Sequence, residues 1–351
     1  MVSGTFWAGR KVFITGHTGF MGGWLALWAS RLGAEVSGYA LAPPTEPSFF
    51  AAVGLERRVA HRLGDVRDGA ALTGAMTAAG PEIVFHLAAQ PIVRTAYAAP
   101  VDTYATNVMG TVNLLEAVRL SPSVRRVVVV TTDKVYDNQE WPWGYRESDR
   151  LGGKEPYGTS KACCEFVTDA YRQSYLTARG VSVATVRAGN IIGGGDWAAD
   201  RLIPDAVRAF QAGRELVIRN PLSVRPWQHV LDMVKGCLML AERLEPGAAD
   251  GQGPWNFGPQ AEECEPVGWI ADRLVSLWGA GAAWRLADGE RPYEAAQLRL
   301  DSARARGPLG WRPVWRLGRA LDLSAGWYKQ FYAGDDMAAA SIRQIEENQN
   351  G

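Results

Sequence analysis

A glycine-rich turn near the N-terminus constrains the fold of this 351-residue chain more than any other feature. Residues 12–14 form an apolar run typical of a buried strand, and residues 21–32 have the pattern of a helix. Gly16, Gly19 and Gly22 lie between them. In such a turn the glycines permit the tight reversal, the approach of backbone to a pyrophosphate, and close packing of helix on sheet. The sequence therefore predicts a dinucleotide-binding turn, although a plain strand-to-helix turn without a ligand is the alternative.

Apolar strands alternate with helices along the first half of the chain. Strands are favoured at residues 35–39, 83–87, 127–130 and 181–186, and a helix at residues 157–175. Continuous apolar strands interleaved with helices are typical of α/β proteins in which both faces of a parallel sheet are covered. We therefore expect an α/β fold with a doubly wound parallel (Rossmann) sheet.

The alternation weakens after Arg187, where Gly-, Pro- and Trp-rich stretches begin. We expect a smaller mixed α/β substrate lobe there. The predicted division gives residues 1–188, with returning segments at about 228–258, to the dinucleotide-binding domain, residues 189–227 and 259–335 to the lobe, and residues 336–351 to a C-terminal tail. The polar tail is expected to be a surface helix or a frayed end. Trp197, Trp227 and Trp255 are expected in the core rather than stacked on a base.

Composition argues against several classes of function. The chain has 37 basic and 37 acidic residues, so no net charge attracts nucleic acid or a membrane. The four cysteines show neither metal-binding nor disulfide spacing. No apolar run approaches the roughly 20 residues of a membrane span, and the N-terminus lacks a signal-peptide pattern. We expect a cytoplasmic protein with no metal site.

Tyr157 and Lys161 are spaced to share one face of a helix. A phenol has a pKa near 10, but a neighbouring ammonium lowers it and lets the phenolate take a proton from a sugar hydroxyl. Lys161 could also hold a nicotinamide ribose. The alternative is an ordinary solvated helix pair, which the glycine turn upstream makes less favoured.

Thr132-Asp133-Lys134 follows the strand expected at residues 127–130. An acid beside an amine can support elimination of water, so this segment together with Tyr157 suggests oxidation, dehydration and re-reduction in one pocket. The alternative is that Asp133 and Lys134 only end the strand in a polar turn.

The identity of the dinucleotide is not decided by the end of the second strand. An acid there would bind a ribose hydroxyl and an arginine would accept a 2′-phosphate, but the chain has Gly38-Tyr-Ala-Leu41. Asp65 and Val66, after the third expected strand, are candidates for an adenine pocket, and Asp65 could equally cap a helix.

From about Lys11 to Trp315 the chain resembles the extended short-chain dehydrogenase/reductase superfamily of nucleotide-sugar enzymes. The resemblance is carried by Thr15-Gly-His-Thr-Gly-Phe-Met-Gly22, Gly64-Asp-Val-Arg-Asp68, His86-Leu-Ala-Ala-Gln90, Thr106-Asn107, Tyr157-x-x-x-Lys161 and Arg225-Pro-Trp-Gln-His-Val-Leu-Asp232. Four longer strings resemble the 4,6-dehydratases that act on CDP-glucose: Thr132-Asp-Lys-Val-Tyr-Asp-Asn138, Trp141-Pro-Trp-Gly-Tyr-Arg-Glu147, Arg187-Ala-Gly-Asn-Ile-Ile-Gly-Gly-Gly-Asp-Trp197 and Ile218-Arg-Asn-Pro221.

This resemblance implies a bound NAD and an internal redox cycle without net redox change. Tyr157 would deprotonate the 4-hydroxyl with Thr132 bonded to the same oxygen, Asp133 would protonate the departing 6-hydroxyl, and Lys134, whose pKa should then be lowered, would remove the C5 proton. Residues expected to bind NAD are Gly16, His17, Thr18, Gly19, Phe20, Met21, Gly22, Asp65, Val66, Leu87, Ala88, Ala89, Gln90, Asn107, Thr131, Tyr157 and Lys161.

The resemblance also implies a nucleotide-sugar substrate held largely by the second lobe. Residues expected to bind it are Arg94, Asn190, Arg201, Arg219, Arg225 and Glu294, with Arg225 on the diphosphate. Relatives suggest a homodimer or homotetramer built through helices around residues 101–119 and 157–175. Met21 and Tyr293 stand where many relatives carry Lys and His. These two departures affect the expected identity of the sugar more than the expected reaction. A sugar 4-epimerase and a catalytically idle nucleotide-binding scaffold are the competing functions.

Overall fold

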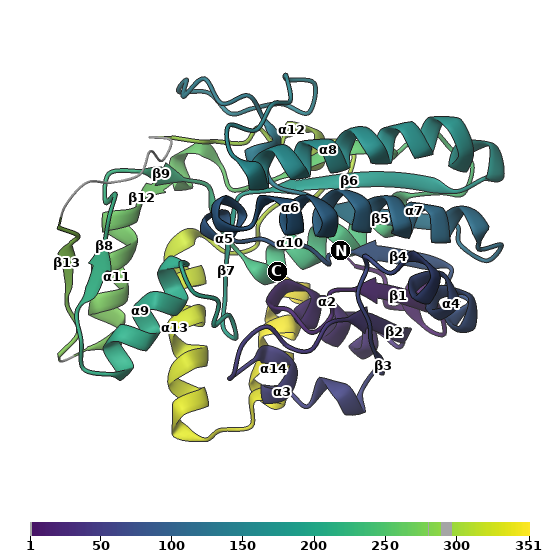
Figure 1. Cartoon of the computed structure of the whole chain (residues 1–351). Helices are drawn as coiled ribbons and strands as arrows, with labels where there is room; N and C mark the ends of the chain where they lie inside the picture. The colour runs from purple at the N-terminus through teal and green to yellow at the C-terminus, as the bar shows by residue number, and fades with distance from the viewer. Residues whose placement is uncertain (1, 280, 289–296) are drawn as a thin grey trace.

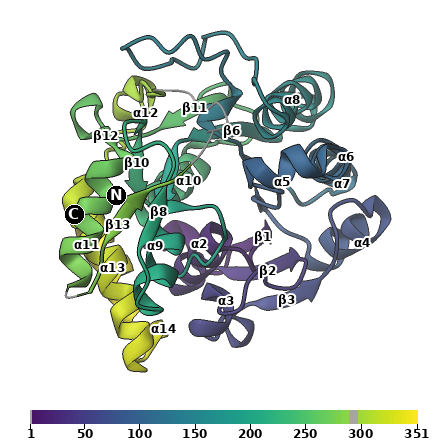
Figure 2. The same cartoon turned by 60° about the vertical axis from the view of Figure 1, so that its left-hand side comes forward.

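The computed structural model of the chain describes residues 2–279, 281–288 and 297–351 (Figure 1). A large parallel sheet flanked by helices forms one part of the molecule, and a smaller lobe of short strands and helices lies beside it (Figures 1 and 2). Within the described residues, no helix is both long enough and apolar enough to cross a membrane.

Seven strands of the described chain form the parallel sheet, in the order β11-β6-β5-β4-β1-β2-β3. Their bounds are β1 Lys11–Thr15, β2 Glu35–Ala40, β3 Ala60–Leu63, β4 Ile83–His86, β5 Arg126–Val130, β6 Ser182–Ala188 and β11 Gly253–Phe257. β1 is an interior strand next to the central β4, with Ile14 opposite Gly38 of β2 and Phe85 of β4. The strand order reverses between β1 and β4, and ligands of open α/β sheets bind at such a switch point. The expectation of a doubly wound Rossmann sheet is confirmed.

Each face of the sheet is covered by its own helices and its own apolar core. One core contains Trp24 of α2, Leu231 of α10 and Ile14 of β1, whereas the opposite core contains Leu72 of α4 and Leu114 of α7. The helices of these layers are α2 Phe20–Arg31, α4 Gly69–Ala79, α7 Gly110–Leu120, α8 Pro156–Tyr171 and α10 Val230–Arg243. Short helical segments connect or extend them: α1 Gly4–Trp7, α3 Phe49–Ala52, η1 Leu55–Arg57, α5 Val93–Ala98, α6 Pro100–Tyr104, η2 Ala105–Met109, η3 Asp133–Val135, η4 Arg172–Leu176 and η5 Thr177–Arg179.

The smaller lobe is built from three two-stranded pairings within the described residues. β7 pairs with β10, β8 with β13 and β9 with β12. The bounds are β7 Asn190–Ile192, β8 Leu216–Ile218, β9 Val224–Arg225, β10 Trp227–His229, β12 Glu265–Pro266 and β13 Trp284–Leu286, with α9 Leu202–Gln211, η6 Ala261–Glu263, α11 Val267–Trp278 and α12 Ala303–Arg306. Trp197, Trp227 and Trp255 are all buried, which confirms their expected place in the core.

The C-terminal residues form two helices that pack on the main core. α13 (Leu317–Ala333) and α14 (Met337–Asn350) lie side by side in yellow in Figure 1. The side chains of Ile345 and Asn348 are fully buried, and Asn348 Nδ2 donates to Asp232 Oδ1 of α10 at 2.9 Å. The last residues are therefore a docked helix, and the alternative of a frayed end is wrong because a buried amide and an apolar face hold the helix down.

Candidate active site

The glycine turn after β1 fits closely on the sheet and is open only on one side. Gly16 has a φ of +78°, and a Cβ on it would lie 2.7 Å from Ala88 N. A Cβ on Gly22 would lie 2.1 Å from Gly16 O. A larger residue at position 22 would therefore keep α2 from packing this closely on the turn. A Cβ on Gly19 would meet only Gly16 O, at 3.4 Å. The backbone at Gly19 therefore has free space beside it at the N-terminus of α2, which is where a dinucleotide places its pyrophosphate in such a fold.

Side chains of the turn tie it to the second and third strands. His17 is fully buried, its Nε2 lies 2.7 Å from His61 Nδ1, and a Cβ at Gly38 would lie 2.3 Å from its ring. Burial, with the nearby His61, lowers the pKa of His17 to about 4, so the imidazole is neutral at pH 7. Thr18 Oγ1 donates to Leu41 O at 2.9 Å. The glycine at position 38 is thus explained by the histidine above it, and the turn presents mainly backbone to a ligand.

The loop after β4 is held between β1 and α8. Thr15 Oγ1 accepts from the backbone N–H groups of Leu87 and Ala88, both at 3.2 Å. Asn107 Oδ1 accepts from Gln90 N at 2.8 Å, while its Nδ2 donates to Ser160 Oγ of α8 at 2.8 Å. Residues expected to bind the cofactor on this loop therefore occupy one rigid unit with the glycine turn.

Asp65 does not cap a helix, so that alternative is wrong. Its Oδ1 accepts from Arg67 N at 2.9 Å, whereas Asp68 Oδ1 accepts from Ala71 N at 3.0 Å and caps α4. The side chain of Arg67 also donates to Asp65 Oδ2, at 2.6 Å, and this bond lowers the pKa of Asp65. The proposed role of Asp65 and Val66 beside an adenine remains a prediction.

Tyr157 and Lys161 lie on the buried face of α8, so they are not a solvated helix pair. The helix begins at Pro156, and Glu155 caps it by accepting from Tyr157 N and Gly158 N, each at 2.7 Å. Lys161 Nζ donates to Val130 O of β5 at 3.1 Å. The cap and this bond fix the phenol and the ammonium at the end of the sheet.

Burial has the largest influence on both groups. It raises the pKa of Tyr157 to about 12, partly offset by a hydrogen bond with Thr132 and by the charge of Arg201. Burial also lowers the pKa of Lys161. The expected lowering of the phenol pKa by the neighbouring ammonium is therefore wrong: the charge of Lys161 is not among the main influences on Tyr157, and the cost of placing a phenolate in a buried position dominates.

Thr132 contacts both proposed proton-transfer groups. Its Oγ1 donates to Asp133 Oδ1 at 3.0 Å, and its side chain is hydrogen-bonded to Tyr157. Asp133 is fully buried, and its Oδ2 has no hydrogen-bond partner among the described residues. Lys134 Nζ lies 3.8 Å from Asp133 Oδ1, with the lysine side chain 35% exposed. The structure therefore brings the phenol, the carboxyl and the amine to one place after β5.

Arginines expected to bind substrate come from both parts of the molecule. Arg94 of α5 and Arg219 after β8 approach the same oxygen, Asp200 Oδ1, at 2.8 and 3.6 Å. Arg201 Nη1 lies 2.9 Å from Asp196 Oδ2. The positive charge of Arg201 also favours a lower pKa of Tyr157. Sequence reasoning missed Asp200, whose φ of +61° is unusual for a residue other than glycine.

The remaining predicted substrate residues divide between the lobe and the undescribed part of the chain. Asn190 begins β7, opposite Trp227 of β10, and Arg225 lies in β9, opposite Glu265 of β12. Glu294 and Tyr293 lie outside the described residues. Among the residues that the structure describes, no group of three or more His, Cys, Asp or Glu side chains could hold a metal ion.

A parallel sheet with a glycine turn at its switch point, and a buried Tyr-x-x-x-Lys pair at the end of β5, defines a dinucleotide-dependent enzyme of the short-chain dehydrogenase/reductase type. Comparison with known families agrees with this class. Residues 12–258 match the NAD dependent epimerase/dehydratase family, and the chain belongs to that family.

Individual members of this family show which enzymes the chain is similar to. The chain is 48% identical over 352 aligned residues to CDP-glucose 4,6-dehydratase of Salmonella typhimurium, covering 99% of this chain and 98% of the relative. It is 27% identical to dTDP-glucose 4,6-dehydratase of Xanthomonas campestris, covering 90% and 92% of the two chains.

Solved structures share the fold. The dTDP-glucose 4,6-dehydratase of Bacillus anthracis in complex with NAD has a TM-score of 0.77 at 20% identity, covering 94% of this chain and all of the other. The UDP-glucuronic acid 4-epimerase of Bacillus cereus, in complex with UDP-glucuronic acid and NAD, has a TM-score of 0.79 at 20% identity, covering 92% of this chain and all of the other. At this identity the likeness concerns the fold alone.

Proposed function

We propose that this chain is a CDP-glucose 4,6-dehydratase, which converts CDP-D-glucose to CDP-4-keto-6-deoxy-D-glucose and water. The observation that carries the proposal is the contact of Thr132 with both Tyr157 and Asp133, because the reaction needs a base at C4 and an acid at C6 of one hexose. The 48% identity to a CDP-glucose 4,6-dehydratase over nearly the whole chain supports the same substrate.

The glycine turn, the loop after β4 and Lys161 would hold the dinucleotide. The open side of Gly19 fits its pyrophosphate, and Lys161, fixed to Val130 O, fits the ribose of the nicotinamide. A bound NAD would supply a hydride acceptor for C4 of the sugar and a hydride donor for C6, so the reaction would have no net redox change. The family to which the chain belongs is NAD dependent, and this supports NAD rather than NADP.

Each step on the sugar has a residue of this chain to move its proton. Tyr157 takes the proton of the 4-hydroxyl, and the 4-ketone that results makes the C5 proton acidic. Lys134 removes that proton while the C6–O bond breaks, and Asp133 gives its proton to the departing oxygen to form water. When C6 receives hydride, the protonated Lys134 returns a proton to C5, which completes the 4-keto-6-deoxy sugar. The free Oδ2 of Asp133 is the oxygen suited to this transfer, since Oδ1 already accepts from Thr132.

The substrate diphosphate would lie among the arginines between the two parts of the molecule. Arg225, Arg219 and Arg94 supply planar donor groups for its oxygens, and Asp200 would be displaced from the last two when the diphosphate arrives. Arg201, Asn190 and Glu294 complete the proposed substrate contacts.

A sugar 4-epimerase is the alternative activity, and a non-catalytic scaffold is a third. Epimerisation needs the phenol and NAD but has no use for an acid and an amine at C6 and C5, so a buried Asp133 within 3.8 Å of Lys134 favours the dehydratase.

The purified protein should be incubated separately with CDP-, UDP-, GDP- and dTDP-glucose, with Tyr157→Phe and Asp133→Asn variants as controls. We expect the ultraviolet absorbance of a 4-keto-6-deoxy product in alkali with CDP-glucose, and a rate of its formation that is lower on the order of 10²-fold or more with either variant. A galactose-configured product would support the epimerase instead, and bound NAD without turnover of any sugar would support the scaffold.

We also infer a homodimer or homotetramer in the cytoplasm. Several large apolar side chains on α6, η2 and α8 are exposed, among them Val101 at 79% and Phe166 at 61%, as expected of a helical interface. The four cysteines are free thiols in the structure, which suits a reducing compartment.

A further inference from the structure

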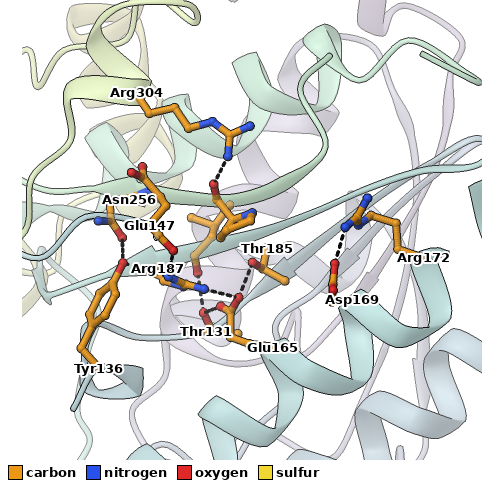
Figure 3. A network of polar contacts seen from close by, with 12 residues as sticks. Thr131, Tyr136, Glu147, Glu165, Asp169, Arg172, Thr185, Arg187, Asn256 and Arg304 are labelled. Atoms are coloured by element: carbon orange, nitrogen blue, oxygen red, sulfur yellow. Dashed lines mark hydrogen bonds and ion pairs between the residues drawn. The ribbon is translucent and has the colours of Figure 1, made fainter. Parts of the chain in front are cut away.

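A buried ion pair lies beneath the proposed active site and has no part in the chemistry described above. Glu165 of α8 and Arg187 of β6 are joined by a bond of 2.9 Å from Nη2 to Oε2, and their side chains are 4% and 3% exposed (Figure 3). Removing two charged side chains from water costs desolvation free energy, and the attraction between them seldom exceeds that cost. A buried ion pair is therefore weak evidence for a role in stability. Its contacts indicate what the pair does.

Glu165 connects the helix of the phenol to the segment of the acid. It lies one turn beyond Lys161 on α8, on the same face as Tyr157. Its Oε1 accepts from Thr131 Oγ1 at 2.5 Å, and Thr131 immediately precedes Thr132 and Asp133. The carboxylate therefore sets the distance between α8 and the end of β5.

Arg187 holds the other end of the same segment. Its Nη1 donates to the hydroxyl of Tyr136 at 2.9 Å and to Glu147 O at 3.0 Å, and Tyr136 in turn donates to Asn256 Oδ1 of β11 at 2.7 Å. Tyr136 directly follows the turn η3 that carries Asp133 and Lys134. Figure 3 shows Tyr136 and Thr131 on either side of the guanidinium.

The strand of Arg187 also borders the acid itself. Gly189 follows two residues later, and a Cβ on it would lie 3.1 Å from the free Oδ2 of Asp133. One ion pair thus fixes the two ends of the segment from Thr131 to Tyr136, the helix of Tyr157, and the strand against which Asp133 rests.

We propose that Glu165 and Arg187 are positioning residues that aim the carboxyl of Asp133 at the 6-hydroxyl of the sugar bound beside Tyr157. This inference rests on the proposed dehydratase function. It implies that loss of the pair impairs proton donation to the leaving group more than any other step, since the phenol is also held by the Glu155 cap of its own helix. A misplacement of about 1 Å in such a group costs on the order of 10²-fold in rate.

The test compares two leaving groups. Hydroxide needs a proton from Asp133 to leave C6, whereas fluoride in CDP-6-deoxy-6-fluoroglucose leaves without one. Glu165→Gln should lower kcat for CDP-glucose on the order of 10²-fold. The ratio of kcat for the fluoro substrate to kcat for CDP-glucose should rise at least about tenfold, as it should in the reference variant Asp133→Asn. Release of fluoride is read with an ion-selective electrode and the ketone product by its absorbance.

Asp232→Asn is the matched control, because Asp232 is a buried carboxyl that accepts hydrogen bonds from several donors, as Glu165 does, but lies in α10. Its ratio of the two kcat values should equal that of the wild type. If Glu165→Gln does not fold, Thr131→Val is the second test. It removes the hydrogen bond between Glu165 and the catalytic segment but keeps the ion pair of Glu165 with Arg187. We expect the same rise in the ratio of the two kcat values. A ratio that stays at the wild-type value in a folded variant overturns the inference. A wild type that converts neither substrate instead contradicts the proposed function.

Discussion

The hydroxyl of Thr132 donates to Asp133 Oδ1 at 3.0 Å, which leaves the other oxygen of this fully buried carboxyl without a partner among the described residues. The same threonine is hydrogen-bonded to the phenol of Tyr157. A single small side chain therefore orients both the proposed acid and the proposed base, and this relationship makes Thr132 the most informative residue to change.

Thr132→Val should lower kcat on the order of 10²-fold, because it removes the hydroxyl and keeps the shape of the side chain. Thr132→Ser should retain most of the activity since it keeps the hydroxyl. Steady-state rates with CDP-glucose measure both. Equal activity of the valine and serine variants would contradict the role of the hydroxyl.

Lys134→Ala should abolish most of the turnover if Lys134 removes the C5 proton, with a loss on the order of 10²-fold or more. Lys154→Ala, an exposed lysine shortly before α8, is the control and should leave kcat unchanged. Full activity of Lys134→Ala would instead favour the interpretation of Asp133 and Lys134 as a simple polar turn at the end of β5.

Gly19 and Gly22 should respond differently to alanine. Gly22→Ala places a Cβ 2.1 Å from Gly16 O, so we expect it to destabilise the protein by about 3 kcal/mol or more. Gly19→Ala meets only Gly16 O at 3.4 Å and has an ordinary φ of −81°, so it should fold normally. Its methyl group enters the space proposed for the pyrophosphate, and NAD affinity should fall at least about tenfold, or about 1.4 kcal/mol. Thermal unfolding and calorimetry with NAD distinguish the two effects, and unaltered NAD affinity in Gly19→Ala would argue against this phosphate site.

Asp232 should make stability depend on pH between about 4 and 6. Burial raises the pKa of Asp232 from 3.8 to about 6, so between these values the folded protein binds a proton that the unfolded chain has lost. The contribution of this residue therefore favours folding at low pH and is lost as pH rises through about 6. The stability of Asp232→Asn minus that of the wild type should increase by about 2 kcal/mol from pH 4 to pH 7. Urea unfolding at several pH values measures it, and a constant difference would contradict the shifted pKa.

Assembly should depend on the exposed apolar side chains of α6 and α8. The double variant Val101→Asp, Phe166→Asp should sediment as a monomer under conditions in which the wild type is oligomeric. Leu222→Asp, which changes an apolar side chain that is 86% exposed in the small lobe, is the control and should not alter the sedimentation. A monomeric wild type would contradict the proposed interface.

Much of the fold was predictable because its signals are local. Three local patterns predict a Rossmann sheet: the apolar strand before Gly16, the spacing of the glycines in the turn that follows, and the alternation of strands with helices. Each of them depends only on short-range preferences and burial. The spacing of Tyr157 and Lys161 likewise places both on one face of a helix, whatever packs against it.

Tertiary structure alone decided which groups meet across long separations in the chain. Three pairs of residues from different elements illustrate this: Thr131 with Glu165, His17 with Gly38, and Asn348 with Asp232. No periodic pattern in the sequence encodes such pairs. It also chose Asp68 over Asp65 as the cap of α4. A local pattern determines which face of an element is apolar, but the partners of a buried polar group are set only when the packed elements exclude water, because only then must each buried donor and acceptor find its counterpart.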